Sequence, residues 1–173
     1  MAGGHAGSRD RIARMQRSVV TVQRADFDLA AEVAALRVGD AQVGAVAAFV
    51  GTMRDRNDGA QVSAMELEHY PGMTEQAIEA MVDEARRRFG IRSARVIHRV
   101  GALQPGDQIV LVAVTSTHRR EAFQACEFLM DYLKTQAPFW KKETTPEGAR
   151  WVDARQADDA ALARWGLEMG NAG

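Results

Sequence analysis

The side chains best suited to binding an anion or moving a proton lie in three short clusters. The first is Ser116-Thr117-His118-Arg119-Arg120, where a predicted buried strand gives way to a helix. The first N–H groups of a helix have no internal partner and the helix dipole is positive there, so a phosphate gains hydrogen bonds and charge together. Arg119 could add a planar, bidentate pair. The cluster predicts an anion site, although a solvated first turn with a surface histidine fits the same residues equally well.

The second cluster consists of three lysines that are close in sequence. Lys134 stands near the end of the same predicted helix, and Lys141 and Lys142 follow a break at Pro138-Phe139-Trp140. An ammonium pressed against apolar rings has its charged form disfavoured, which makes an amine a usable proton donor, acceptor or nucleophile near neutral pH. In the alternative interpretation Lys134 only favours the C-terminal end of the helix dipole, and the other two lysines are solvated.

The third and weakest cluster is Gly51-Thr52-Met53-Arg54, where an apolar strand ends and a polar loop begins. Arg54 could reach a ligand at the strand edge, or it could pair with Asp55 or Asp58. The remaining reactive residue types give no further site. His98 lies within a strand pattern and is interpreted as a structural histidine.

Cys126, the single cysteine, lies on the apolar face of a predicted helix and is expected to be inert. Any sulfur chemistry would therefore need a sulfur that a partner supplies. The chain has no Gly-rich phosphate loop, no serine nucleophile elbow and no metal-ligand spacing, so we expect neither a metal nor a cofactor.

Composition excludes several classes of protein. The chain has 173 residues, 46% of them hydrophobic, and a formal net charge of -1, which gives no global field to attract nucleic acid or an anionic membrane. No apolar run approaches the roughly 20 residues that cross a bilayer. One cysteine cannot form an intramolecular disulfide. We expect a cytoplasmic protein.

Three helices are predicted to carry the clusters. Asp28 caps the first, the second runs from Thr74, which can cap it, to Phe89, and Thr117 caps a third that ends before Pro138. The third helix is expected to bury Phe123, Cys126, Leu129, Met130 and Leu133.

Strands are predicted at 19–23, 43–52, 62–69, 94–100 and 109–116, the last in the centre of a sheet. The stretch 139–152 is predicted to be irregular. These elements favour an α+β fold, a single domain over 19–155 with a mixed, mainly antiparallel sheet and two long helices. Residues 1–18 are predicted to be a disordered Arg-rich tail and 156–173 a C-terminal tail or short helix.

Several long blocks, in order, resemble the molybdopterin synthase catalytic subunit family, MoaE. The blocks are Phe49-Val50-Gly51-Thr52-Met53-Arg54, Leu67-Glu68-His69-Tyr70-Pro71-Gly72-Met73, Val96-Ile97-His98-Arg99-Val100-Gly101, Thr115-Ser116-Thr117-His118-Arg119 and Tyr132-Leu133-Lys134-Thr135-Gln136-Ala137-Pro138-Phe139-Trp140-Lys141-Lys142-Glu143. The resemblance runs from about Val19 to Arg155 and is much more specific than any one motif.

The resemblance implies an α/β-hammerhead-like fold and an enzyme of molybdenum cofactor biosynthesis. Members of the family bind cyclic pyranopterin monophosphate and receive sulfur from the C-terminal thiocarboxylate of a small ubiquitin-like sulfur-carrier subunit, forming the dithiolene of molybdopterin. The resemblance also implies a homodimer of large subunits with one small subunit at each end, a heterotetramer.

Carried over position by position, the family's substrate contacts fall on Thr52, Met53, Arg54, His118, Arg119, Lys134, Lys141, Lys142 and Glu143. Lys134 matches the lysine on which catalysis in the family depends most, and Lys141 matches a second important one. Lys134 is expected to act as general acid and base or as a transient partner of the thiocarboxylate carbonyl, and Lys141 to stabilise developing negative charge. Met53 and Lys142 stand where other residues are expected to be tolerated.

Two other functions compete with this one. A non-catalytic adaptor could bind a ubiquitin-like tail or a phosphorylated ligand through the same basic groove, but the intact Lys134 and Lys141 argue against it. A nucleic-acid binder using Arg54, Arg119 and the Arg-rich tail would need a basic face and exposed aromatic side chains for stacking, whereas the isoelectric point is about 6.4 and there are only two tyrosines.

Overall fold

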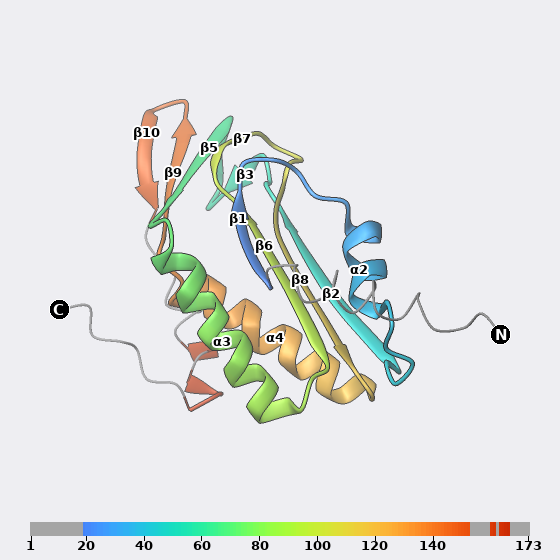
Figure 1. The fold of residues 1–173 in the computed structure, drawn as a ribbon. Coiled ribbons are helices and arrows are strands. Elements are labelled where there is room, and N and C mark those ends of the chain that lie inside the picture. The colour runs from blue at the N-terminus through green and yellow to red at the C-terminus, as the bar shows by residue number, and fades with distance from the viewer. Residues whose placement is uncertain (1–18, 153–159, 162, 167–173) are drawn as a thin grey trace.

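Two four-stranded sheets and three helices form most of the chain in the computed structural model, which describes residues 19–152, 160–161 and 163–166 (Figure 1). In chain order the elements are β1 (Val20–Gln23), α2 (Leu29–Arg37), β2 (Ala45–Thr52), β3 (Arg56–Asn57), β4 (Ala60–Gln61), β5 (Ala64–His69), α3 (Met73–Phe89), β6 (Ser93–Arg99), β7 (Gly101–Leu103), β8 (Gln108–Ser116), α4 (Arg119–Thr135), β9 (Phe139–Thr145) and β10 (Gly148–Val152). The predicted α+β class with a mixed, mainly antiparallel pairing and two long helices is confirmed. The predicted tail 1–18 and most of 156–173 lie outside the described residues.

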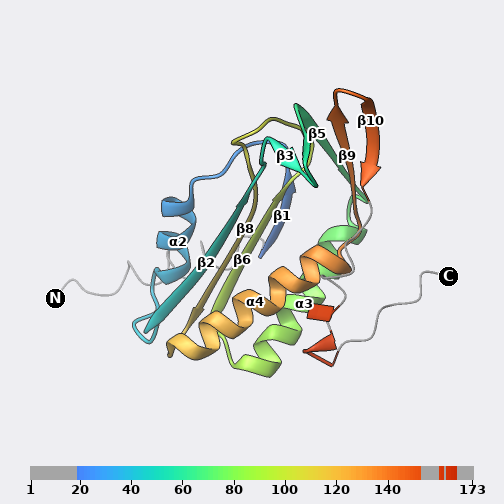
Figure 2. The same ribbon diagram turned by 180° about the vertical axis from the view of Figure 1, so that it is seen from behind.

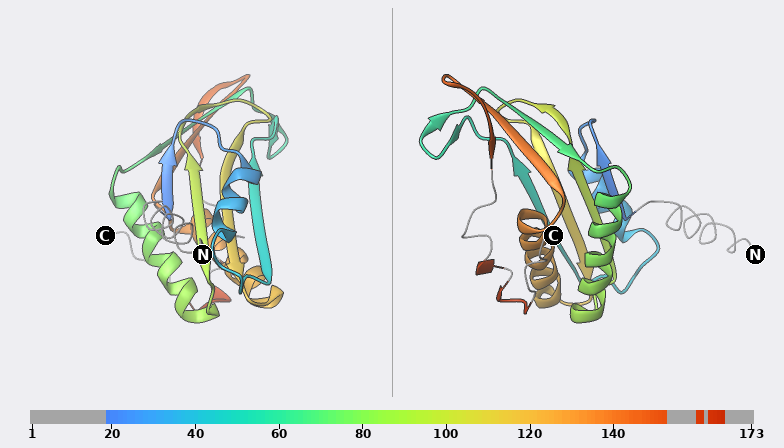
Figure 3. Two further views of the ribbon diagram at one scale, coloured as in Figure 1. Left: turned by 45° about the vertical axis from the view of Figure 1, so that its right-hand side comes forward. Right: turned by 90° about the vertical axis from the view of Figure 1, so that its left-hand side faces the viewer.

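The first sheet has the strand order β1-β6-β8-β2, with β1 parallel to β6 and the other pairs antiparallel. As predicted, β8 is central, and its residues 110–116 are all buried. The long helices α3 and α4 cover one face of this sheet and α2 covers the other (Figure 3). Ile78, Val82 and Phe128 are fully buried between the helices and the sheet, and this layer is the main hydrophobic core.

The second sheet is antiparallel, in the order β10-β9-β5-β7, and extends beyond the ends of α3 and α4 (Figures 1 and 2). Its own apolar cluster includes Met65, Leu67 and Leu103. The β9–β10 hairpin corrects the prediction that 139–152 is irregular. Its charged residues hid the strand pattern, and its pairing partner β5 lies about 75 positions earlier in the chain.

The helix starts differ in part from the prediction. Asp28 does cap α2, its Oδ1 accepting from Ala31 N at 3.1 Å. The N-cap of α3 is Gly72 rather than Thr74, and that of α4 is His118 rather than Thr117.

The predicted buried face of α4 also needs one correction. Phe123 is 67% exposed, whereas Cys126, Leu129 and Leu133 are buried as predicted. The buried stripe runs through Ala122 and Ala125 instead, so Phe123 lies to one side of it.

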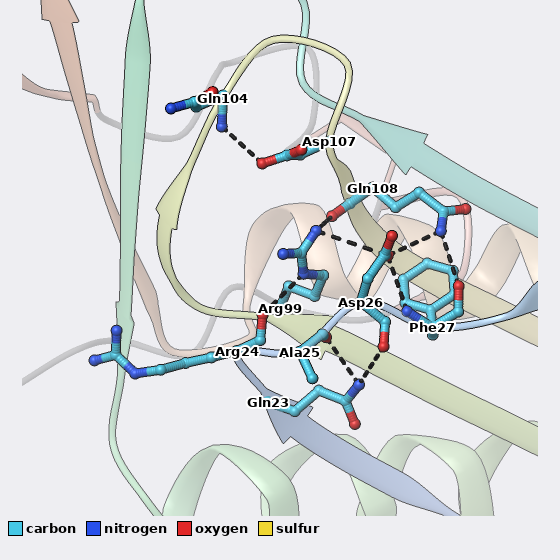
Figure 4. Close-up of polar contacts among 9 residues, drawn as sticks. All are labelled: Gln23, Arg24, Ala25, Asp26, Phe27, Arg99, Gln104, Asp107 and Gln108. Carbon is cyan, nitrogen blue, oxygen red and sulfur yellow. Dashed lines mark hydrogen bonds and ion pairs between the residues drawn. The ribbon is translucent and has the colours of Figure 1, made fainter.

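Hydrogen bonds of polar side chains connect the start of α2 to one end of the first sheet (Figure 4). This end of the first sheet lies next to the second sheet. Arg99 donates from Nε to Arg24 O at 3.1 Å and from one terminal nitrogen to Gln108 O at 2.9 Å. Gln108 Nε2 donates to Asp26 Oδ1 and to Phe27 O, both at 2.9 Å. The hydrogen bond from Gln108 lowers the pKa of Asp26, with smaller contributions from Phe27 N–H and Arg99.

Two positions require glycine. Gly101 has φ +83°, a backbone conformation that L side chains rarely adopt. A Cβ on Gly44 would collide with the Thr117 carbonyl, because the start of β2 lies directly against the β8–α4 junction. Near the C-terminus, Trp165 packs edge-on against Phe128 at 5.6 Å between ring centroids. No helix formed by the described residues is long and apolar enough to span a bilayer.

Candidate active site

A cavity of about 380 Å³ lies where the two sheets meet the C-terminal end of α4. Figure 2 shows α4 running along the first sheet to the base of the second, where β9 begins. The walls mix apolar side chains such as Phe49, Leu133 and Phe139 with cationic ones. A site of this size with a few polar groups on apolar walls is typical of small-molecule binding.

Three predicted cations line this one cavity although they come from different elements. Arg54 follows the end of β2, Lys134 lies in the last turn of α4, and Lys141 lies on β9. Thr52, at the end of β2, lines the cavity as well. Lys134 is exposed at the cavity rather than pressed against the apolar wall as its sequence context suggested, and the Lys141 side chain is about one third exposed.

The connection between the two lysines is held by a buried threonine. Thr74 Oγ1 donates to Pro138 O at 3.1 Å and accepts from Tyr70 N at 3.1 Å. The side chain is fully buried. The start of α3 therefore fixes the segment that leads from Lys134 to Lys141.

Glu143 is buried beside Lys141 and is surrounded by donors. Its Oε1 accepts from Asn57 Nδ2 at 2.7 Å and lies 3.2 Å from Lys141 Nζ, and its Oε2 accepts from Arg150 at 3.5 Å. Residues 141 and 143 of a strand face the same side, which brings the two together. The carboxylate orients Lys141 and balances its charge.

Glu143 contacts Lys141 but is not among the residues that line the cavity, and two other predicted contacts, Met53 and Lys142, do not line it either. Met53 is 5% exposed and belongs to the apolar cluster of the second sheet, while its backbone bonds to Gly106 and Asp107 fix the adjoining turn. Lys142 lies on the opposite face of β9 from Lys141, with Nζ 5.7 Å from the centre of the Trp151 ring.

The structure places His118 and Arg119 far from the lysines. They lie exposed at the N-terminal end of α4, and His118 makes no side-chain capping hydrogen bond. Fifteen residues at about 1.5 Å of rise per residue separate Arg119 from Lys134 by about 22 Å along the helix. A single chain therefore does not bring these two clusters together.

His98, which we interpreted as structural, lines the same cavity. It is 8% exposed, and its ring stacks on Phe139 with centroids 3.8 Å apart. The pKa of His98 is lowered to about 4, mainly by burial and to a smaller extent by the charges of Lys134 and His69, against a hydrogen bond to Arg99 O that raises it. The sequence signal that could have shown this inward position is strand alternation, which puts His98 on the same face of β6 as the core residue Val96.

Cys126 lies within the main core, as expected. Its Sγ is 3.8 Å from Val112 O, and burial raises the pKa of the thiol to about 11. The thiol is therefore protonated and unreactive at neutral pH. The cavity can neutralise an anion and supply amines for proton transfer, but sulfur must come from elsewhere.

Comparisons with known proteins agree on one family. The model of the MoaE protein family matches residues 22–136. The molybdopterin synthase catalytic subunit of Ralstonia nicotianae is 67% identical over 153 residues, which cover 88% of this chain and 87% of that protein.

Solved structures give the same result. The molybdopterin biosynthesis MoaE protein from Burkholderia ambifaria is 60% identical, with a TM-score of 0.76 over 88% of this chain and 100% of that one. The complex of subunits 1 and 2 of molybdopterin-converting factor from Helicobacter pylori matches with a TM-score of 0.65 over 79% of this chain and 92% of that one, and at 19% identity this likeness concerns the fold alone. With the family model spanning well over half of its length, the chain belongs to the MoaE family.

Proposed function

We propose that this chain is the catalytic subunit of a molybdopterin synthase. It transfers sulfur from the C-terminal thiocarboxylate of a small ubiquitin-like subunit to cyclic pyranopterin monophosphate and so forms a dithiolene. The observation that carries the proposal is the meeting of Arg54, Lys134 and Lys141 in one cavity. Family membership and the name of the Ralstonia nicotianae relative support it.

Binding of the substrate begins with its phosphate. Arg54 follows β2, which is part of the first sheet, so its backbone is held in place. Its planar guanidinium can then bind the phosphate. Two ammonium groups share the cavity, and together the three cations more than balance the charge of Glu143.

Lys134 is the residue we place at the reacting carbon. The thiocarboxylate sulfur attacks this carbon, the C–O bond breaks, and the Lys134 ammonium donates its proton to the oxygen that leaves. Water then attacks the acyl carbon of the resulting thioester, the Lys134 amine takes up the proton of that water, and the small subunit leaves as a carboxylate while the sulfur stays on the pterin. Lys141, held by Glu143 at 3.2 Å, stabilises the negative charge that develops on the acyl oxygen in this second step.

The sulfur donor must be a partner, because Cys126 is buried and protonated. An extended C-terminal tail fits this need, since a chain end can enter a cavity that a folded domain cannot. The cytoplasm is the setting we propose for the reaction, on the basis of the composition.

His118 and Arg119 belong to this scheme only if a second copy supplies them. In a homodimer with antiparallel α4 helices, the first turn of one helix would lie beside the last turn of the other. The anion-binding start of α4 in one copy would then complete the cavity of its neighbour. A mixed dimer of Arg119→Ala and Lys134→Ala chains tests this, because one of its two sites would keep both residues and about half of the activity per dimer.

Reconstitution tests the proposal itself. The purified chain, the cyclic pterin phosphate and a thiocarboxylated small subunit are combined and scored for dithiolene product. Lys134→Ala should lower the rate by about 10² to 10³. Arg87→Ala, an exposed residue of α3 far from the cavity, is the matched control. Tight binding of the small subunit without product from the unmodified chain would favour a non-catalytic adaptor.

A further inference from the structure

The backbone carbonyl of Arg99 determines which ring nitrogen of His98 carries the hydrogen. Nδ1 lies 2.9 Å from the carbonyl oxygen of Arg99. A carbonyl oxygen can only accept a hydrogen bond, so Nδ1 carries the hydrogen and donates. The other ring nitrogen, Nε2, is then left with a lone pair and acts as an acceptor.

The surroundings keep the ring neutral and in place. Phe139 stacks on one face at 3.8 Å between centroids, and bulk solvent reaches 8% of the residue. The charged groups that act on it, Lys134 and His69, are cations when charged, and both disfavour a second positive charge there. Lys141 and Arg54 line the same cavity. His98 is therefore an uncharged acceptor in a cavity whose charged groups, Arg54, Lys134 and Lys141, only donate.

We propose that His98 positions the substrate by accepting, through Nε2, a hydrogen bond from an N–H or O–H group of the pterin ring system. The inference rests on the proposed function. A lone pair repels phosphate oxygens, which have no hydrogen to donate, whereas a reduced pterin carries several N–H donors along its rings. His98 thus marks the heterocycle end of the cavity and leaves the phosphate to Arg54.

Three substitutions separate this role from a structural one. His98→Asn keeps a donor near the Nδ1 position for Arg99 O but has no acceptor at the Nε2 position. His98→Gln puts an amide oxygen near the Nε2 position. His98→Phe keeps a ring to stack on Phe139 and removes both nitrogens. Arg87→Gln is the control, because Arg87 is exposed on α3 and does not line the cavity.

The measurements are KM and kcat for the cyclic pterin phosphate with thiocarboxylated small subunit, together with thermal unfolding of each variant. We expect His98→Asn and His98→Phe to raise KM about 10-fold with kcat changed less than about 3-fold, the loss expected for one buried hydrogen bond. His98→Gln should recover KM to within about 3-fold of the unmodified chain.

Two results would overturn the inference. If His98→Asn matches the unmodified chain in KM, the lone pair does not contact substrate. If Asn and Gln are equally impaired and both lower Tm, the histidine is only structural. To cover variants that turn over poorly, binding of the pterin phosphate is also measured by titration in a Lys134→Ala background, where an unchanged Kd on adding His98→Asn refutes the role. Failure of the unmodified chain to bind the pterin would overturn the proposed function as well.

Discussion

Glu143 offers the sharpest test of how this cavity is built. In Glu143→Gln the side chain keeps its shape but loses its negative charge, and half of its acceptor capacity becomes donor. Lys141 and Arg150 then face a neutral amide, and Asn57 loses a charged acceptor at 2.7 Å. We expect a less stable protein whose Lys141 is poorly held.

The size of the effect follows from burial. The two cations are 34% and 47% exposed, so solvent screening reduces each ion pair to about 0.5 kcal/mol. The Asn57 contact is buried at both ends, and the change of its acceptor from a carboxylate to a neutral amide costs about 1 kcal/mol. The sum, about 2 kcal/mol, lowers Tm by about 6 °C for a chain of this length. Loss of Lys141 positioning should reduce kcat by about 10-fold or more.

Urea unfolding, a thermal melt and the reconstituted rate are compared with those of Glu66→Gln. Glu66 lies on the neighbouring strand β5, is exposed, and pairs in register with Lys142 rather than Lys141. The Glu66→Gln control should have the same Tm and the same kcat as the unmodified chain. Equal Tm and equal kcat for Glu143→Gln would refute the reasoning, because they would mean that the carboxylate neither stabilises the hairpin nor orients Lys141.

Further predictions concern strand facing, the core and pH. Lys141→Ala should lower the rate by about 10² and Lys142→Ala by less than about 3-fold, because only the first faces the cavity; steady-state rates decide this. Phe128→Ala should lower the free energy of unfolding in urea by about 3 to 5 kcal/mol, since Phe128 is fully buried. A hydrogen bond from Arg87, with others, lowers the pKa of Glu84 from 4.5 to about 2. A depressed carboxyl pKa stabilises the fold above the ordinary value, so this contribution should be present above about pH 4.5 and be lost toward pH 2. Glu84→Gln should therefore differ from the unmodified chain in urea at pH 7 and converge with it near pH 2.

Most of the fold could be predicted because its elements carry their own signals. The apolar run of β8 and the helical spacing of Ile78 and Val82 each reflect a face that is buried against another layer. The β9–β10 hairpin could not, since its inward face holds Lys141 and Glu143, whose burial depends on each other and on Asn57 rather than on an apolar pattern.

Part of the candidate site could also be predicted from the sequence. Sequence context identified Arg54, Lys134 and Lys141, and the structure brings them together because β2, α4 and β9 meet at the junction of the two sheets. The separation of Arg119 from Lys134 was not predicted. The two residues are close in sequence, but they lie at opposite ends of one helix. His98 was missed because its surroundings come from Phe139 and α4, which lie at least 20 positions away.

The short connector between α4 and β9 has a consequence for how the length of this chain can vary. Residues 136–138 join the two lysine-bearing elements, and Thr74 fixes the last of them. An insertion of one residue here would leave every helix and both sheets able to form. It would nevertheless shift β9 by one position against β5, turning Lys141 outward and Lys142 inward. Changes in length are therefore tolerated at the tip of the β9–β10 hairpin, but not three residues after the helix.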